Sequence, residues 1–213
     1  MCGRYYVDDE TSREIRKILE QIDAKCERKT LSHPNIQGST AGWTAECNGS
    51  KYENNKRSYG EIFPTNSAPM LAAFHEKIEP ELSIWGFPNY YNKGVLINAR
   101  AETVLDKKTF RESVFSRRCV IPSNGFYEWD RNKKKILFKK EESDVLYMAG
   151  IYNFYQEECR FVILTTQANE SMAEVHNRMP VVLKRDDMEK WILDNNSISR
   201  ILQQIPPLLT RTA

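Results

Sequence analysis

The most informative absences in this sequence concern membranes and export. No apolar run approaches the roughly 20 residues that a membrane-spanning helix requires, and the chain does not open with a basic segment followed by an apolar one. The sequence therefore predicts neither a membrane-spanning helix nor a secretory signal. Nothing in it favours attachment to a membrane surface.

Metal-ligand and disulfide patterns are also missing. The 5 cysteines are odd in number and far apart, no C-x-x-C pair occurs, and the 3 histidines show no metal-ligand spacing. A disulfide framework needs paired cysteines, and a structural zinc site needs closely spaced ligands. We therefore expect reduced cysteines, no metal or other cofactor, and a reducing compartment, which is the cytoplasm or, in a eukaryote, the nucleus.

An excess of charge of one sign is lacking as well. The 31 basic and 29 acidic residues give a formal net charge of +2, which does not by itself indicate a nucleic-acid-binding protein. A local basic groove can nevertheless lie within a balanced total. With 213 residues, of which 40% are hydrophobic, the chain can bury a core of ordinary size, and we predict a single domain over residues 1–213.

An amphipathic helix and a polar stretch distinguish the N-terminal quarter. Between Thr11 and Ile22 the apolar residues follow the i, i+3, i+4, i+7 spacing of a helix, and Thr11 with Glu14 fits a capping box. Residues 25–58 are polar and show no periodicity. We predict that they form a long surface insertion within the single domain.

The rest of the chain alternates apolar runs with turn residues, which predicts strands joined by short connections. The predicted strands are Met70–Phe74, Leu82–Phe87, Gly94–Asn98, Cys119–Pro122, Gly125–Trp129, Ile136–Phe138, Val145–Phe154 and Arg160–Thr166. The basic run from Arg131 to Lys135 indicates a hairpin turn. The predicted short helices are Phe110–Phe115, Glu170–Val175, Met188–Leu193 and Ile198–Gln203. We therefore predict an α+β fold, with a core of mainly antiparallel β-sheet or an open barrel and short peripheral helices.

Cys2 has the most distinctive chemistry in the sequence. Methionine aminopeptidases remove Met1 when the next side chain is small, and the chain would then begin with an α-amine and a thiol on neighbouring carbons. Such an amine has an ordinary pKa of about 7.7–8.0, so much of it is neutral near physiological pH. It can condense with an aldehyde to an imine, on which the thiol can close a thiazolidine ring. The same terminus could instead attack an amide, as N-terminal nucleophile hydrolases do.

Two further residues suit proton transfer. Glu128 lies between Tyr127 and Trp129. A carboxyl group flanked by aromatic rings is poorly solvated and can hold and deliver a proton, although on an amphipathic strand it would simply face solvent. His176 lies in a predicted loop, and the imidazole of a histidine suits acid–base work or phosphate binding. Arg178 beside it would complete a small anion-binding patch.

Other side chains could contact a terminal amine or a nucleic acid. Asn98 ends an apolar run, and its amide could orient the amine of a chain terminus. Arg4 and Arg100 could each clamp a phosphate through two hydrogen bonds, or serve only in structural ion pairs. Three aromatic residues could stack on bases or belong to the core: Trp85, Tyr90 and Tyr91.

Several motifs follow one another in a fixed order along the chain. After the opening Met-Cys-Gly-Arg come FPTNSAPML, WG, NARAET, RRCVIPSNGFYEW, ILTTQAN and HNRMPVVL. As a set, these motifs resemble the SOS response-associated peptidase (SRAP) family, and the resemblance covers nearly the whole chain. The segment after WG is shorter than the family pattern, and residues 25–58 lie where we expect members to differ.

The resemblance implies a protein that senses and shields abasic sites in single-stranded DNA. It gives Cys2 the covalent bond to the abasic sugar, Asn98 the positioning of the Cys2 amine, and Glu128 and His176 roles at the sugar. It also implies that Arg4, Arg100, Pro64, Thr65 and Asn66 hold the DNA backbone. To these predicted DNA contacts we add Trp85, as a ring that could stack on a base, and Arg178, as part of the anion-binding patch. An imine alone would allow β-elimination and strand cleavage, a lyase outcome, whereas ring closure would suppress cleavage and acid could reverse the crosslink. We therefore expect a monomer that acts at the nucleoid or, in a eukaryote, in the nucleus.

Two other functions would use the same residues. An N-terminal nucleophile peptidase or amidohydrolase would employ Cys2 with His176 as the base, and would turn over an amide without DNA. A non-catalytic module that reads modified or junction DNA would bind with steep salt dependence, and its binding would survive Cys2→Ala. The second alternative leaves Glu128 and His176 without a role.

Overall fold

The computed structural model describes residues 2–8, 13–18, 20–21, 24, 60–74, 77–90, 92–141 and 145–212. The insertion predicted at residues 25–58 lies outside these residues. Near the N-terminus, residues 13–18, 20–21 and 24 are helical, and Ile15 and Ile18 are buried. The predicted amphipathic helix is thus confirmed for the residues that are described, while Thr11 of the capping box lies outside them.

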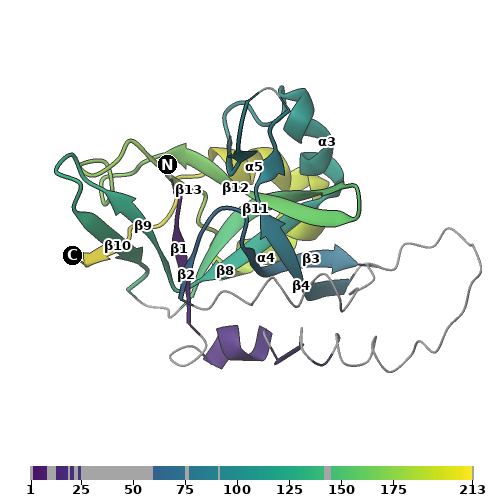
Figure 1. Cartoon of the computed structure of the whole chain (residues 1–213), viewed down its shortest axis with the longest axis horizontal. Coiled ribbons are helices and arrows are strands. Elements are labelled where there is room, and N and C mark those ends of the chain that lie inside the picture. Colours follow the sequence, from purple (N-terminus) through teal and green to yellow (C-terminus); the bar gives the residue numbers. More distant parts are fainter. Residues whose placement is uncertain are drawn as a thin grey trace, which may run out of the picture.

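The core of the molecule is a closed ring of five strands (Figure 1). β11 pairs with β8, β8 with β3, β3 with β4 and β4 with β12, and a further pairing of β12 with β11 closes the ring. These pairings are antiparallel except that of β4 with β12, which is parallel. The ring strands are β3 (Ser67–Phe74), β4 (Lys77–Trp85), β8 (Arg118–Ser123), β11 (Leu146–Tyr155) and β12 (Glu158–Gln167).

Strand β12 carries two short additional strands that become important for the site. β7 (Asn98–Arg100) pairs with it in parallel, and β13 (Arg178–Pro180) pairs with it in antiparallel orientation. Both strands pair with the last residues of β12, so that Thr165 is the partner of Arg100 on one side and of Pro180 on the other. Residues from three distant parts of the chain are therefore held at one end of β12.

A second sheet places the N-terminus against the middle of the chain. Its strand order is β14 (Thr210–Thr212), β10 (Lys135–Lys139), β9 (Gly125–Trp129), β1 (Tyr5–Val7) and β2 (Gly60–Ile62). Neighbouring strands in it are antiparallel. A separate hairpin is formed by β5 (Phe87–Pro88) and β6 (Val95–Leu96).

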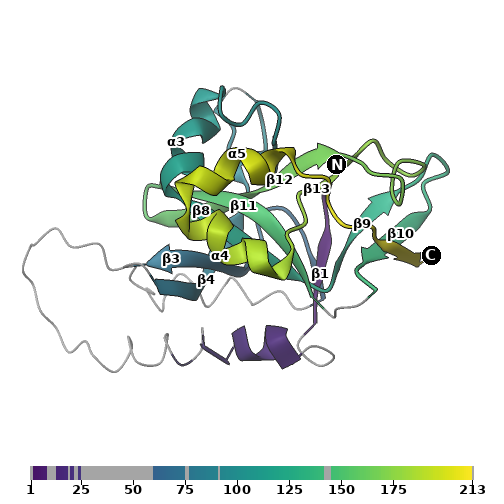
Figure 2. The same cartoon turned by 180° about the vertical axis from the view of Figure 1, so that it is seen from behind.

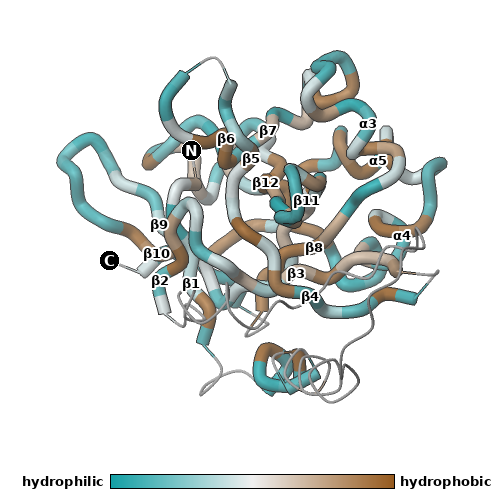
Figure 3. Tube along the Cα trace, turned by 45° about the vertical axis from the view of Figure 1, so that its right-hand side comes forward, coloured by the Kyte–Doolittle hydropathy of each residue, from teal (hydrophilic) through white to brown (hydrophobic). Residues whose placement is uncertain are grey.

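Short helices pack on the outside of the ring (Figure 2). They are α3 (Lys108–Ser116), α4 (Arg185–Leu193), the 3-10 turn η1 (Asn195–Ser197) and α5 (Ile198–Gln203). Trp191 of α4 is fully buried, and its indole N–H donates to the carbonyls of Cys119 at 3.0 Å and Gly150 at 3.2 Å. Because both faces of β8 are covered, all six of its residues are buried. The tip of the β9–β10 hairpin, by contrast, is hydrophilic (Figure 3).

The α+β class and most of the predicted elements are confirmed, including the hairpin turn at 131–135. The Asp130 carboxylate accepts the backbone N–H groups of Asn132 and Lys134, both at 2.8 Å, and Lys133 adopts a φ of 63°. Side-chain hydrogen bonds of this kind stabilise tight turns. No helix in the described part of the chain has the length and apolar character that crossing a membrane requires.

Three element predictions were wrong, each for a local reason. Residues 170–175 form turns rather than a helix, because backbone hydrogen bonds to Asn169 and Met172 mix three- and four-residue spans. The strand expected at Leu82–Phe87 breaks at Gly86, whose φ of 115° lies in the region that favours glycine. The strand expected at Gly94–Asn98 breaks at Ile97, whose carbonyl turns away to accept hydrogen bonds from the Trp85 indole and the Ile163 backbone.

Candidate functional site

Cys2 is fully buried immediately before strand β1. The antiparallel register pairs Tyr5 with Phe126, and the Tyr127 N–H donates to the Arg4 carbonyl at 2.9 Å. The pairing of β1 with β9 therefore runs the N-terminus alongside the end of β9, where Glu128 lies. The Cys2 thiol donates a weak hydrogen bond to the Arg4 carbonyl at 3.7 Å.

Asn98 makes the direct contact with the N-terminus. It is the first residue of β7, which is fixed by its pairing with Ile163 of β12. Its Nδ2 donates to the Cys2 carbonyl at 2.9 Å, joining residues 96 positions apart. The Asn98 Oδ1 atom is buried, and no donor among the described residues reaches it. The amide thus holds Cys2 with one end and offers a buried acceptor with the other.

Glu128 is poorly solvated, as expected, but not because of its aromatic neighbours. Strand β9 alternates, so Glu128 points inward with Phe126 and is 4% exposed, while Tyr127 and Trp129 lie half-buried on the opposite face. The core therefore desolvates the carboxyl group. Burial first, and then the Glu128 carboxylate, raise the pKa of the Cys2 thiol well above its ordinary value. The resting thiol is protonated and lies within electrostatic reach of Glu128.

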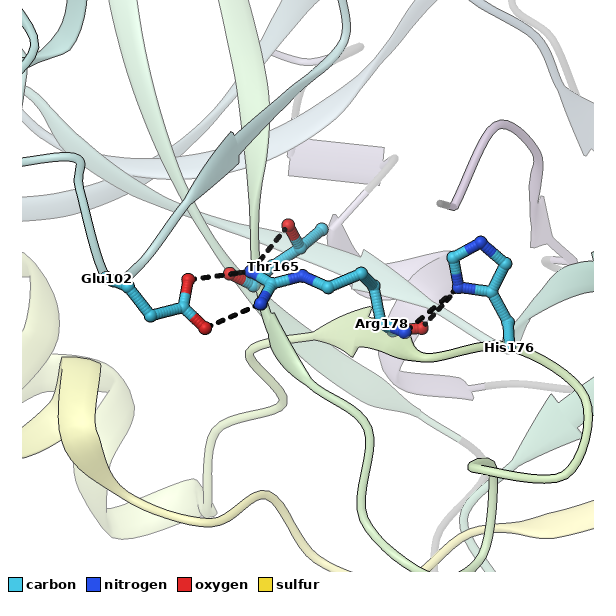
Figure 4. A network of polar contacts seen from close by, with 4 residues as sticks. All are labelled: Glu102, Thr165, His176 and Arg178. Carbon is cyan, nitrogen blue, oxygen red and sulfur yellow. Dashed lines mark hydrogen bonds and ion pairs between the residues drawn. The ribbon is translucent and has the colours of Figure 1, made fainter.

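His176 has a defined ring orientation (Figure 4). Its Nδ1 accepts the Arg178 backbone N–H at 2.9 Å and lies 3.2 Å from the Arg178 carbonyl. The shorter contact assigns Nδ1 as an acceptor, so the proton of the neutral imidazole resides on Nε2. The side chain borders an open cavity of about 500 Å³, which is lined by Arg100, Gln167, His176, Asn177 and Arg178.

The two arginines of this cavity differ in their availability. Arg100 is exposed. Arg178 is 14% exposed in its side chain, because both of its terminal nitrogens bind the Glu102 carboxylate, at 2.5 and 2.7 Å, and one also donates to the Thr165 carbonyl at 2.7 Å (Figure 4). The anion-binding patch expected of His176 and Arg178 is therefore already occupied on the arginine side by a carboxylate.

Arg4 is likewise engaged. Its guanidinium binds Glu61 at 2.9 Å and stacks over the rings of Phe63, at 4.2 Å, and Trp129, at 5.0 Å from the ring centres. Lys135 also forms an ion pair with Glu61. The cation predicted to clamp a phosphate is thus built into a surface of stacked aromatic and charged groups, of which Phe63 is exposed.

The predicted contacts Pro64, Thr65 and Asn66 form the tight turn between β2 and β3. The Asn66 side chain accepts the Phe63 N–H at 2.9 Å, and the Thr65 N–H donates to the Trp85 carbonyl at 2.8 Å. Thr65 adopts a φ of 72°, which is unfavourable for a β-branched residue. Thr65 is exposed, so this turn presents a rigid edge to solvent.

The expectation that Trp85 stacks on DNA is wrong. Its side chain is fully buried, stacks on Phe161 at 6.5 Å, meets Tyr5 edge to face at 5.1 Å and donates its indole N–H to the Ile97 carbonyl at 2.9 Å. A ring enclosed in this way is not accessible to a base. Tyr90, on the β5–β6 hairpin, is instead 79% exposed, and Tyr91 lies outside the described residues.

A family model supplies the decisive comparison. The model described as SOS response associated peptidase (SRAP) matches residues 1–211. The chain belongs to the SRAP family.

Individual relatives agree with this membership. The abasic site processing protein YoaM of Bacillus subtilis is 38% identical over 119 residues, which are 52% of this chain and 52% of YoaM. The abasic site processing protein HMCES of Gallus gallus is 30% identical over 124 residues, which are 45% of this chain and 37% of that protein. The match thus spans about half the length of the Bacillus relative. A solved Bordetella bronchiseptica protein has the same fold, with a TM-score of 0.65 at 18% identity over 99% of this chain and 98% of that one.

Sequence reasoning missed several residues of this SRAP site. Glu61 and Phe63 surround Arg4, while Glu102 and Thr165 hold Arg178. Each is separated from its partner by at least 13 positions, so no local spacing could reveal the contact. For Glu102, its place within the NARAET motif was the one available signal.

Proposed function

We propose that this SRAP protein processes abasic sites in single-stranded DNA by forming a thiazolidine between Cys2 and the C1′ aldehyde of the abasic sugar. Removal of Met1 would first expose the Cys2 α-amine. The observation that carries the proposal is the Asn98–Cys2 hydrogen bond beside the buried Glu128. The relatives named as abasic site processing proteins point to the same substrate.

The site chemistry supports a sequence in which the amine reacts first. Glu128, when protonated, donates to the ring oxygen of the closed sugar and favours the open aldehyde. The neutral amine attacks C1′, and loss of water leaves an imine. The thiol sulfur then adds to C1′ while its proton passes to the nitrogen, so the net reaction releases one water and involves no redox change. Protonating the ring nitrogen would reverse the closure.

The raised pKa of the Cys2 thiol favours this order over a cysteine peptidase mechanism. A peptidase needs a thiolate in the resting enzyme, whereas burial and Glu128 disfavour that thiolate here. An iminium cation formed on the adjacent nitrogen would lower the cost of ionising the sulfur, because an opposite charge at short range stabilises the thiolate. The thiol would therefore become nucleophilic only once the sugar is bound covalently.

The surroundings suggest how the DNA would lie. Exposed Arg100 and His176 border the open cavity, where they could bind a phosphate next to the abasic sugar. Exposed Tyr90, and the part of the Phe63 ring that Arg4 leaves uncovered, offer surfaces for base stacking. We include the turn formed by Pro64, Thr65 and Asn66 in this contact surface.

Intact-protein mass spectrometry tests the proposal most directly. The purified protein is weighed to confirm loss of Met1, mixed with a single-stranded oligonucleotide that contains one abasic site, and weighed again. We expect a heat-resistant adduct whose mass equals protein plus oligonucleotide minus one water. Cys2→Ala should abolish it, while Cys159→Ala, which removes a different free cysteine, should leave it intact.

Absence of the adduct from the trimmed wild-type protein would refute the crosslinking function. A stable adduct that persists in Cys2→Ala would refute the thiazolidine while leaving abasic-site binding in place. Borohydride distinguishes the two covalent forms, because it traps an imine but is not needed to preserve a closed ring. Turnover of a peptide amide without DNA would instead favour the hydrolase.

A further inference from the structure

The contacts in Figure 4 link an acidic residue on one edge of β12 to the histidine on the other. Glu102 lies in the turn that follows β7, and that turn is tied to β12 because the Ala101 N–H donates to the Thr165 carbonyl at 2.8 Å. The same Thr165 carbonyl accepts from the Arg178 guanidinium at 2.7 Å. Glu102 and Thr165 therefore fix the Arg178 side chain from one rigid platform.

Arg178 in turn holds the His176 ring through its backbone. The Arg178 N–H donates to His176 Nδ1 at 2.9 Å, which sets both the plane of the ring and the tautomer with Nε2 protonated. His176 closes the loop between β12 and β13, and Arg178 is the first residue of β13. Arg178 forms the end pair of the β12–β13 ladder, with Gln167, so a shift of its backbone would move or release the imidazole.

The Glu102–Arg178 ion pair contributes little to the stability of the fold. The Glu102 side chain is 46% exposed, and exposed ion pairs contribute little to stability. The two side chains nevertheless adopt a specific geometry, in which two parallel hydrogen bonds join the carboxylate to the guanidinium. The pair also withholds a cation from solvent beside a cavity that we expect to bind an anion.

We propose that Glu102 is a positioning residue for His176: by fixing Arg178, it holds the imidazole ring and its Nε2–H tautomer ready for the abasic sugar. The inference rests on the proposed function for its chemical consequence, but its structural part stands independently. With Glu102 removed, the start of β13 loses its side-chain anchor on the turn after β7. The Arg178 backbone can then shift, and the ring gains a second orientation in which Nδ1 carries the proton and donates to the Arg178 carbonyl, which lies 3.2 Å away in the structure.

The first experiment reads the ring itself, without DNA. Long-range ¹H–¹⁵N correlation spectra of the imidazole groups report which ring nitrogen is protonated, and His176→Ala identifies the His176 signals. We expect a single Nε2–H tautomer in the wild-type protein and in Glu102→Asp, and a mixture of tautomers in Glu102→Ala. A wild-type tautomer pattern in Glu102→Ala would overturn the proposal even if no crosslink ever formed.

The second experiment measures crosslinking against DNA concentration. General acid–base groups contribute about 10²- to 10⁴-fold to rates, and a loosened group forfeits part of that, so we expect Glu102→Ala to lower the rate at saturating DNA about tenfold. The DNA concentration for half-maximal rate should stay near that of the wild type. Glu158→Ala is the matched control, because Glu158 forms a two-point pair with Arg160 at the distant β11–β12 hairpin.

A double-mutant cycle with His176→Ala decides whether Glu102 acts through the histidine. We expect Glu102→Ala to have no further effect once His176 is absent. The same loss of rate in both backgrounds, or a change confined to the half-maximal DNA concentration, would overturn the positioning role. If the wild-type protein itself forms no adduct, the proposed function fails, and the tautomer measurement alone decides the role of Glu102.

Discussion

Replacing Asn98 by alanine tests the contact on which the proposed chemistry depends. The substitution removes the 2.9 Å hydrogen bond from Nδ2 to the Cys2 carbonyl, together with the buried Oδ1 acceptor. The backbone of β7 should persist, because its pairing with β12 does not involve the side chain. We therefore expect a folded protein whose N-terminus is poorly held.

The size of the effect follows from the hydrogen bond that is lost. Leaving a partly buried carbonyl without its donor costs about 1–3 kcal/mol, and 1.4 kcal/mol corresponds to about a tenfold change in rate when the bond orients the reacting group. We expect Asn98→Ala to slow single-turnover crosslinking to an abasic oligonucleotide by about 5- to 150-fold. Denaturing gels quantify the adduct, and thermal denaturation confirms folding.

Asn98→Asp separates the two functions of the amide. It retains the acceptor but loses the donor, and its carboxylate would favour the charged, non-nucleophilic ammonium form of the terminus. Crosslinking should therefore be slow at neutral pH and recover as the pH rises, a recovery that Asn98→Ala lacks. Asn153→Ala is the matched control, since that amide accepts the N–H of the neighbouring Phe154 on β11. Crosslinking by Asn98→Ala within twofold of the wild-type rate would refute the reasoning.

Three further predictions concern stability, pH and DNA contact. Arg118→Leu should lower the free energy of unfolding by about 3–5 kcal/mol in urea titrations, because the buried guanidinium donates to four carbonyls at the ends of α3 and α4; an unchanged midpoint would contradict this. Lys135 lowers the pKa of Glu61, and Arg178 lowers the pKa of Glu102. These pairs therefore stabilise the fold at pH values above the carboxyl pKa of the unfolded chain, which is about 4.3. The stabilisation is lost as the pH falls through the lower pKa values of the folded state. The double variant Glu61→Gln, Glu102→Gln should accordingly lose less unfolding free energy than the wild type on acidification, as measured by circular dichroism. Tyr90→Ala should leave the melting temperature unchanged and weaken binding of single-stranded DNA in fluorescence anisotropy, and equal affinity would exclude stacking on this ring.

Short-range patterns in the sequence predicted most of the elements. The strands of the ring are apolar because they are covered on both sides, and the hairpin at 131–135 is fixed by an aspartate bonding to its own turn. The strands that were missed, β1, β2, β13 and β14, have three residues each, which is too short for a periodicity to be recognised. The strand predicted at Gly94–Asn98 is interrupted at Ile97, because a distant group, the Trp85 indole, binds the Ile97 carbonyl.

The candidate site was predictable as a set of residues but not as an arrangement. Cys2, Asn98 and Glu128 were singled out for their chemistry, and the fold brings the first two into direct contact. Their spacing along the chain gave no information on that contact, because it depends on β1 pairing with β9 and β7 pairing with β12. The sequence also could not show whether the arginines are free to bind a phosphate. Arg4 and Arg178 are paired with carboxylates that lie 57 and 76 positions away along the chain.

The sequence by itself determined the chemical inventory: a cysteine at position 2, the order of the motifs and the alternation that makes each strand, because these depend on covalent neighbours. Only the tertiary structure decided which groups are buried, paired or exposed. Trp85 became core and Tyr90 surface, and Glu128 turned inward while its aromatic neighbours turned out. Burial and electrostatic pairing depend on groups that meet across strands, so the packing of the sheets settles them and local sequence does not.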